Sequence, residues 1–323
     1  MKKMKDVYGR EIEYLRLSVT QNCNLRCIYC APEDSRADNT KCDSILSPKE
    51  MGMVVKALAG LGIRKVRITG GEPLLRPDIY EIVSHISSIP GIEDISMTTN
   101  GICLEKAACK LKESGLIRLN ISIDSLRKEK FAYLTGGGNI EDVLEGIKTA
   151  LNEGLSPVRL NTVLIKGVND DEVDDFIALT ENLPLDVRFI ELMPIGNFGE
   201  DNTDRIVYND SIIEKRPWLI PCHVEDKGHP ARYYRIEGFK GRVGFISPMS
   251  HKFCRYCNRI RLTCDGKLLP CLGSNTEIDI LDVLRNKPDE LVDILRKSIY
   301  EKPKGHNFEN KSSSKRSMKM IGG

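Results

Sequence analysis

The sequence contains too little cysteine for a disulfide-stapled protein. It has 11 cysteines among 323 residues, whereas small secreted proteins held together by disulfides carry roughly 8–10% cysteine. The count is also odd, so a complete set of internal disulfides would leave one thiol over. A chain of this length can bury a stable core without cross-links, in one large domain or two smaller ones. The cysteines therefore need an explanation other than a disulfide scaffold.

Long apolar runs and an excess of either charge are absent as well. No stretch approaches the roughly 18 uncharged apolar residues of a transmembrane helix. The basic residues at 1–6 lead into no apolar segment, so we expect no secretory signal peptide. The net charge of +2 predicts neither a nucleic-acid partner nor a membrane partner. We expect a cytoplasmic protein, in which thiols stay reduced and clustered cysteines indicate metal binding or catalysis.

Up to about residue 195, short apolar runs alternate with amphipathic stretches. The runs predict strands at 14–20, 65–69, 94–99, 117–124, 157–165 and 185–192. The stretches predict helices near 48–61, 78–88, 104–114, 140–153 and 171–182. Strands that alternate with helices form a parallel sheet, either open or rolled into an incomplete barrel. In both arrangements ligands bind at the C-terminal ends of the strands.

After residue 196 this alternation stops. We expect a loop at 196–210, a short helix around 212–216, short antiparallel strands at 232–237, 242–247 and 259–263, and two charged helices near 279–298. Residues 310–316, rich in lysine and serine, have the composition of a disordered tail. A boundary near 222 would divide the chain into a larger α/β domain, 1–222, and a smaller domain, 223–323.

Seven of the 11 cysteines fall into two groups. The first comprises Cys23, Cys27 and Cys30, which follow the first predicted strand with three and then two residues between them. Three thiolates on one short loop can converge on an iron–sulfur cluster and leave one metal position open to a ligand. A zinc site is a weaker alternative, because no histidine or fourth cysteine lies nearby in the sequence. Three buried thiols that are close by chance are weaker still.

The second group comprises Cys254, Cys257, Cys264 and Cys271. Its spacing fits a zinc site of four thiolates. It also fits a second iron–sulfur cluster on Cys254, Cys257 and Cys271 with Cys264 as a bystander, and the spacing does not decide between the two. The remaining cysteines are isolated and we expect them to be buried: Cys42, Cys103, Cys109 and Cys222. Cys103 and Cys109, in or beside an amphipathic helix, are expected to be small core residues.

With Tyr29 between its last two cysteines, the first group resembles the loop of radical S-adenosylmethionine (SAM) enzymes. In that family three cysteines hold a [4Fe–4S] cluster whose fourth iron binds the methionine part of SAM. The segment Gly70-Gly71-Glu72-Pro73, at the end of the second predicted strand, resembles the family's GGEP segment, whose backbone and glutamate meet the SAM amino group. Glycine fits there because a side chain would block a close approach of the backbone.

A closer resemblance, over nearly the whole chain, is to the GTP 3′,8-cyclase family of molybdenum cofactor biosynthesis. It is carried by the segments that begin at Arg16, Lys65, Met97, Asn120, Phe189 and Phe253, and by the final Gly322 and Gly323. It implies an α/β fold, an incomplete (β/α)6 TIM-like barrel, with a smaller α+β domain that holds an auxiliary [4Fe–4S] cluster. It implies a lyase in which reductive cleavage of SAM gives a 5′-deoxyadenosyl radical. That radical removes H3′ of GTP, and C3′ then bonds to C8 to give 3′,8-cyclo-7,8-dihydro-GTP.

The resemblance also assigns residues to the site. It implies SAM binding by Tyr29, Gly71, Ser122 and Met193. It implies GTP binding by Arg16, Arg67, Thr98, Arg159, Arg259, Ile260 and Arg261, with Lys65 a further candidate for the triphosphate. It implies that two [4Fe–4S] clusters are held by Cys23, Cys27 and Cys30 and by Cys254, Cys257 and Cys271, and that Gly322 and Gly323 help to close the site. A triphosphate needs several cations, so in a nearly neutral chain they must be concentrated in one place.

Two residues depart from the family pattern. Arg159 stands where the family commonly has lysine, which keeps the charge but replaces a point charge with a planar fork. Cys264 is additional to the family's three auxiliary cysteines. A fourth thiolate would block the iron that the family leaves free for the guanine base, so we expect Cys264 to point away from the cluster.

The resemblance implies a flavodoxin- or ferredoxin-like reductant and transfer of the product to cyclic pyranopterin monophosphate synthase. It allows a homodimer, but the sequence does not fix the oligomeric state. A radical SAM enzyme acting on a peptide is a rival that would not need the set of arginines. A zinc-binding module without activity is a second rival, and it leaves the first cysteine group and the GGEP segment unexplained.

Overall fold

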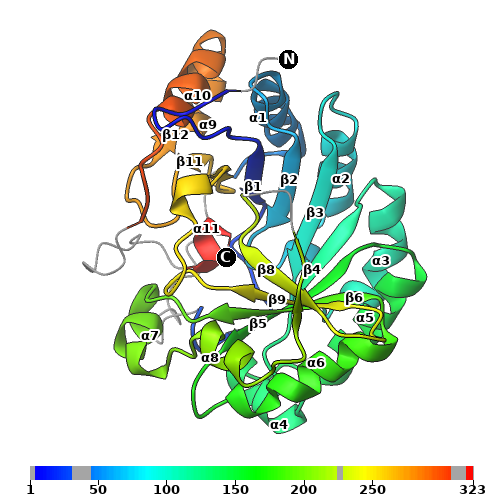
Figure 1. Ribbon diagram of the computed structural model, residues 1–323. Helices are drawn as coiled ribbons and strands as arrows, with labels where there is room; N and C mark the ends of the chain where they lie inside the picture. The colour runs from blue at the N-terminus through cyan, green and yellow to red at the C-terminus, as the bar shows by residue number, and fades with distance from the viewer. Residues whose placement is uncertain (1–3, 31–44, 224–227, 307–317, 323) are drawn as a thin grey trace.

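The computed structural model describes residues 4–30, 45–223, 228–306 and 318–322. Within them twelve strands form one sheet in the order β12-β11-β10-β1-β2-β3-β4-β5-β6-β9-β8-β7. The strands are β1 (Tyr14–Ser18), β2 (Lys65–Thr69), β3 (Asp94–Thr99), β4 (Arg118–Ser122), β5 (Val158–Leu164), β6 (Leu185–Glu191), β7 (Ile220–Pro221), β8 (Ala231–Arg235), β9 (Arg242–Ile246), β10 (Arg259–Leu262), β11 (Lys267–Leu269) and β12 (Ile278–Asp279). Figure 1 shows the sheet curving into an open, incomplete barrel.

The six predicted strands are β1 to β6, and they run parallel in sequence order. The helices between them are α1 (Pro48–Gly60), α2 (Ile79–Ser87), α3 (Leu104–Glu113), α4 (Lys128–Thr135), α5 (Ile140–Asn152) and α6 (Val173–Asn182). These helices lie on the outer side of the curved sheet (Figure 1). The predicted helix start at 48 is explained by a capping box, in which Ser47 and Glu50 each accept the other's backbone N–H.

Strands β7 to β12 extend this sheet at both edges. At one edge β9 pairs parallel with β6, followed by antiparallel β8 and β7. At the other, β10 pairs parallel with β1, followed by antiparallel β11 and β12. The prediction of antiparallel strands is therefore wrong for two of these pairings. Periodicity identifies a strand but says nothing about a partner more than 50 residues away.

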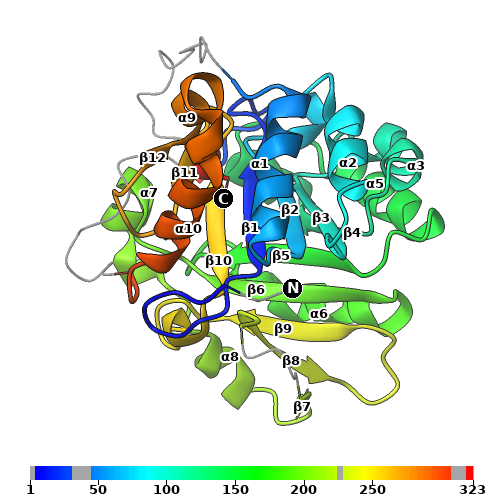
Figure 2. The same ribbon diagram turned by 90° about the horizontal axis from the view of Figure 1, so that it is seen from above.

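Three short helices also differ from the sequence prediction. Residues 196–210 were expected to form a loop, but they contain α7 (Gly196–Asp201), and α8 (Asn209–Glu214) starts earlier than expected. The sequence analysis missed α4 altogether. The two charged helices are present as α9 (Ile280–Asn286) and α10 (Leu291–Tyr300), and Figure 2 shows them beside α1. The predicted disordered tail and Cys42 lie outside the described residues.

The isolated cysteines are less buried than expected. Cys109 is exposed and donates to the Glu113 carboxylate, and Cys103 and Cys222 are half-buried. In α3 the buried side is formed by Leu104, Ala107, Ala108 and Leu111, which leaves Cys109 on the opposite side of the helix. The expectation of a core role is wrong for Cys109. No helix of the described residues is long and apolar enough to cross a membrane.

Candidate active site

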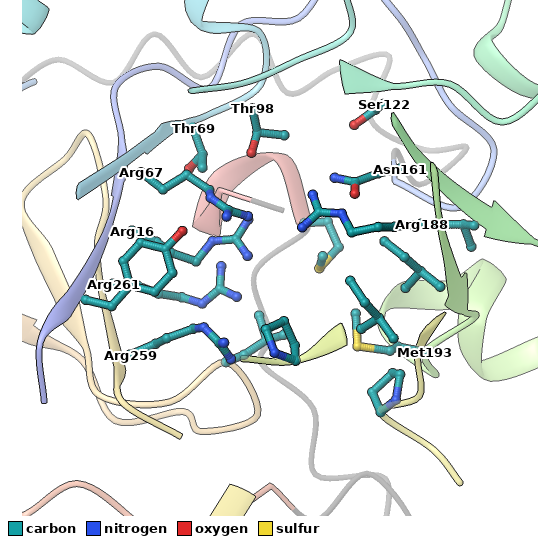
Figure 3. Close-up of a pocket in the computed structure, with 18 of the residues that line it drawn as sticks. Arg16, Arg67, Thr69, Thr98, Ser122, Asn161, Arg188, Met193, Arg259 and Arg261 are labelled. Atoms are coloured by element: carbon teal, nitrogen blue, oxygen red, sulfur yellow. The ribbon is translucent and has the colours of Figure 1, made fainter. Parts of the chain in front are cut away.

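A cavity of about 560 Å³ lies inside the curve of the sheet. Figure 3 shows polar side chains from several strands pointing into it. Of the residues that the sequence analysis assigned, the cavity is lined by Arg16, Cys23, Cys27, Tyr29, Cys30, Lys65, Arg67, Gly71, Thr98, Ser122, Arg159, Met193, Cys254, Cys257, Arg259, Arg261 and Cys271. One concave site thus brings together residues from both halves of the sequence.

Of the assigned residues that the structure describes, two are not among those that line the cavity, Ile260 and Gly322. Ile260 is 1% exposed and packs in the hydrophobic core, because side chains alternate along β10 and its neighbours Arg259 and Arg261 face the cavity. Gly323 lies outside the described residues. Gly322 is placed beside the site by the hydrogen bonds described below.

The first cysteine loop is held by the helix that sequence analysis missed. The N–H groups of Arg26 and Ile28 donate to the carbonyls of Thr135 and Leu134, at the C-terminal end of α4, at 2.8 and 3.0 Å. The last carbonyls of a helix have no partners within the helix, so they are available to hold such a loop. On the other side, the Tyr29 hydroxyl donates to Asp124 Oδ2 at 2.6 Å.

The three thiols of this loop lie together along the cavity. Burial raises the pKa of Cys27 well above its usual value and that of Cys30 to about 12. Thiolates here need a positive partner, and iron supplies one. Two backbone N–H groups also donate to sulfur, from Leu25 to Cys23 at 3.4 Å and from Lys319 to Cys30. The donors present therefore fit an iron–sulfur cluster.

The two glycines of the GGEP segment are required by the fold. A Cβ on Gly71 would lie 2.3 Å from the carbonyl oxygen of Asn22, and one on Gly70 would lie 2.5 Å from that of Thr20. The N–H groups of Gly71 and Glu72 donate to these same two carbonyls, Thr20 at 2.8 Å and Asn22 at 2.7 Å. The backbone of the GGEP segment therefore lies close to the residues that follow β1, directly before the cysteine loop.

We expect Gly71→Ala to lower the free energy of unfolding by about 1–3 kcal/mol, because the clash is with backbone that has no free space to move into. It should also weaken SAM binding, since it displaces the cysteine loop. Thermal unfolding and SAM titration measure the two effects. Gly60→Ala, at a helical position with nothing within 4 Å of the new Cβ, is the control and should be neutral or stabilising. Equal stability of the two variants would contradict the argument.

The carboxylate of Glu72 is held by three hydrogen bonds within the protein. Its carboxylate accepts from the Thr99 hydroxyl at 2.7 Å, the Asn100 N–H at 2.7 Å and the Leu74 N–H at 3.0 Å. It is fully buried, and burial raises its pKa to about 7. These contacts join the ends of β2 and β3. Glu72 is not among the residues that line the cavity, and the contact with a SAM amino group, which the resemblance implies, stays a prediction.

Three arginines form a row across neighbouring strands. Arg261 on β10 pairs in register with Arg16 on β1, and Arg16 pairs in register with Arg67 on β2. Residues in register on adjacent strands point to the same side of a sheet, and like charges placed in this way repel each other. Figure 3 shows the three guanidinium groups gathered at one side of the cavity.

The electrostatics of this row favour a polyanion. Burial and the neighbouring cations lower the pKa of Arg67 to about 9 and that of Arg261 to about 10, and lower the pKa of Arg16 well below its usual value. The Nε atom of Arg67 is buried without a hydrogen-bond acceptor among the described residues. A cluster of buried cations is unfavourable unless an anion compensates it. A triphosphate offers several charges and acceptors at once.

The structure adds residues that sequence analysis did not single out. Arg188 on β6 is 1% exposed and lines the cavity from the side opposite the arginine row (Figure 3). Its Nη2 donates to Asn120 at 2.5 Å, and its Nε has no acceptor among the described residues. Asn161 and Tyr14 also line the cavity. The available signal for Arg188 was an arginine between the apolar residues Val187 and Phe189 of a predicted strand.

The second cysteine group divides as the iron–sulfur alternative requires. Cys254, Cys257 and Cys271 line the cavity, whereas Cys264 is 1% exposed and is not among the lining residues. Cys264 thus lies apart from the other three thiols of the group, as a cluster on Cys254, Cys257 and Cys271 requires.

The end of the chain reaches the cavity. Helix α11 (Met318–Ile321) lies inside the curve of the sheet (Figure 1). Arg261 Nη1 donates to the carbonyls of Gly322 at 2.7 Å and Ile321 at 3.2 Å. Gly322 has φ +71°, and a Cβ there would lie 2.0 Å from Thr69 Oγ1. Glycine is thus required at this position by both conformation and space.

Comparison with known proteins agrees with this geometry. Residues 17–180 match the model of the radical SAM superfamily, and residues 185–308 match that of Molybdenum Cofactor Synthesis C. Among solved structures, Streptococcus suis SuiB bound to S-adenosylmethionine aligns over 90% of this chain and 69% of its own, with 16% identity and a TM-score of 0.61. At that identity the likeness shows the fold alone.

Relatives along the whole chain are more informative. A GTP 3′,8-cyclase of Alkaliphilus oremlandii is 51% identical over 99% of this chain and 100% of its own. One of Peptoclostridium acidaminophilum is 48% identical over 98% of both chains. Members of this family use SAM and two [4Fe–4S] clusters. Identity of this extent, together with a cavity that joins two cysteine groups to a row of arginines, shows that the chain belongs to the GTP 3′,8-cyclase family of radical SAM enzymes.

Proposed function

We propose that the cavity is the active site in which this chain, as a GTP 3′,8-cyclase, converts GTP to 3′,8-cyclo-7,8-dihydro-GTP. The observation that carries the proposal is the in-register row of Arg261, Arg16 and Arg67, in the same cavity as both cysteine groups. When bound, the first cluster and SAM supply the radical chemistry that removes the 3′ hydrogen of GTP. The residues of the chain bind and orient the reactants and keep water away.

We propose that Cys23, Cys27 and Cys30 hold the SAM-binding cluster, next to the proposed SAM residues Tyr29, Gly71, Ser122 and Met193. Support comes from their common place along the cavity. The hydrogen bond from Tyr29 to Asp124, whose other oxygen accepts the Val163 N–H at 2.8 Å, ties the cysteine loop to β4 and β5. A fixed loop orients SAM toward the centre of the barrel, which is what positioning at the reacting carbon requires.

We propose that GTP lies across the cavity with its triphosphate against the arginines Arg16, Arg67, Arg159, Arg188 and Arg261. Guanidinium forks match phosphate oxygens in bidentate pairs. Thr98 Oγ1, buried without a partner in the described structure, supplies a further hydrogen-bonding group. In this proposal the guanine base lies toward Cys254, Cys257 and Cys271. Arg259 and Arg261 line the cavity together with these cysteines, and Arg261 also belongs to the arginine row. Because the side chain of Ile260 is in the core, Ile260 would contact GTP only through its backbone.

The tail closes the site in this proposal. Gly322 occupies space between Thr69 and Arg261, two residues at the proposed triphosphate end. Because Arg261 donates to the Gly322 carbonyl, the tail holds this guanidinium in place beside Arg16 and Arg67. Gly323 extends the same segment.

Further assignments rest on the family. We propose that a flavodoxin- or ferredoxin-like protein reduces the first cluster, that the product passes to cyclic pyranopterin monophosphate synthase, and that the protein acts in the cytoplasm. We also propose that the chain divides into parts 1–222 and 223–323, which share one sheet because β7 pairs with β8, β1 with β10 and β6 with β9 across the boundary. Sedimentation tests whether the protein forms the homodimer that the resemblance allows.

Anaerobic incubation of the reconstituted chain with SAM, a reductant and GTP tests the function. Cyclised nucleotide and 5′-deoxyadenosine should form together, and ATP in place of GTP should give no cyclised product. Formation of 5′-deoxyadenosine that is independent of GTP, with no cyclised nucleotide, would refute the substrate assignment. It would favour an enzyme with another substrate, such as a peptide.

A further inference from the structure

Lys302 is a buried lysine that has no carboxylate partner in the described part of the chain. It lies two residues after α10 and is 1% exposed. Its Nζ donates to the carbonyl of Pro270 at 2.5 Å. In the described residues no Asp or Glu forms a salt bridge with it. Lysine is almost never fully buried unless it is paired, so this ammonium requires another source of negative charge.

The groups around Lys302 are the thiols of the second cysteine group. Lys302 lines the cavity together with Cys254, Cys257 and Cys271, and Pro270, which accepts its N–H, directly precedes Cys271. The charge of Lys302 acts on the thiols of both Cys254 and Cys257.

The backbone around Lys302 is fixed against this group. Arg10 is buried and ion-paired with Asp6 at 2.6 Å. Its guanidinium donates to the carbonyl of Cys254 at 2.9 Å, that of Lys302 at 3.3 Å and that of Pro303 at 2.6 Å. One arginine therefore joins the segment that contains Lys302 to the segment that contains Cys254.

Gly305 and His306, which follow Lys302 in the sequence, also lie against Cys254. A Cβ on Gly305 would lie 3.3 Å from the Cys254 sulfur and 3.1 Å from its Cβ, and the N–H of His306 donates to that sulfur. Partners of this kind, outside the direct ligands, set the potential of an iron–sulfur cluster through charge and hydrogen bonds to sulfur.

We propose that Lys302 is the counter-ion of the auxiliary cluster. Its ammonium offsets the negative charge that Cys254, Cys257 and Cys271 carry as cluster ligands, and it thereby raises the reduction potential of that cluster. A reduced cluster holds one more electron, so a nearby cation favours it. The inference rests on the proposed function, because it takes these cysteines as ligands. Lys302 acts through the cluster and not on GTP.

The test is a dithionite titration of the reconstituted full chain, followed by electron paramagnetic resonance, with SAM added to mark the first cluster. In Lys302→Met the potential of the auxiliary cluster should shift to a more negative value. In Lys302→Arg, which keeps the charge, it should stay close to the wild type. The SAM-binding cluster is an internal control, and Lys297→Met, which removes an exposed lysine on α10, is a control for net charge.

Each outcome bears on the proposal. An unchanged potential in Lys302→Met with full iron content overturns it. Loss of about four irons in Lys302→Met but not in Lys302→Arg supports it, because the charge alone then decides whether the cluster is held. Loss in both variants overturns it in favour of a packing role. A wild-type chain that binds only about four irons refutes the cluster assignment itself, which is a separate failure from that of Lys302.

Discussion

Cys271→Ala should lose about four of the roughly eight irons that two [4Fe–4S] clusters bring to each chain, while Cys264→Ala should keep all of them. Cys271 lines the cavity with Cys254 and Cys257, whereas Cys264 is buried elsewhere. Removing one of three thiolates leaves too few ligands to hold a cluster. When the auxiliary cluster is lost, GTP cyclisation should disappear as well, because the guanine base no longer has the cluster to bind to. Iron and sulfide assays and the cyclisation assay measure the two effects.

Cys264→Ala is the matched control for this comparison. It removes one sulfur from a packed site, so the expected cost is about 1 kcal/mol of stability, seen as a small fall in the melting temperature with iron content and turnover retained. A zinc site of four thiols predicts the opposite, since both substitutions would then release the same metal. Equal metal loss in the two variants, or zinc in place of iron, would contradict the assignment.

The first cysteine group could be singled out from the sequence because the information is local. Three thiols within eight residues must lie close together in any fold, and no long-range contact is needed to see it. Cys264 was different, since spacing alone allowed it to be a ligand. Its exclusion depends on which way the chain turns after β10, and that turn is fixed by the pairing of β10 with β1 and β11.

The sequence identified the arginines of the row but did not predict that they would lie side by side. Sequence indicated cations in several strands, but not that Arg261 would stand in register beside Arg16. That neighbour comes from a strand about 245 residues later, and register depends on tertiary contacts. Arg188 was missed for a related reason. A buried strand with one arginine is ambiguous in sequence until the fold shows that this position faces a cavity and not the core.

Arg67→Met should weaken GTP binding by roughly 10- to 150-fold, which corresponds to the loss of about 1.5–3 kcal/mol for a hydrogen bond to a charged group. Arg67 has no hydrogen-bond acceptor among the described residues, and its ring contact is with Tyr14, 5.4 Å from the centroid. The substitution therefore breaks no described hydrogen bond, and it removes one of several mutually repelling cations. The melting temperature of the protein without GTP should stay constant or rise.

This combination separates binding from structure. A residue kept for structural reasons would lower the melting temperature on substitution, and a residue kept to hold a polyanion would not. Calorimetric titration of GTP, thermal unfolding and SAM titration give the three readouts, and SAM affinity should be unchanged. Arg296→Met, at an exposed position paired only with Asp293 in the described structure, is the control for loss of one positive charge. Unaltered GTP affinity in Arg67→Met, or an equal loss in Arg296→Met, would show that the row does not hold the triphosphate and that the charge effect is a general one.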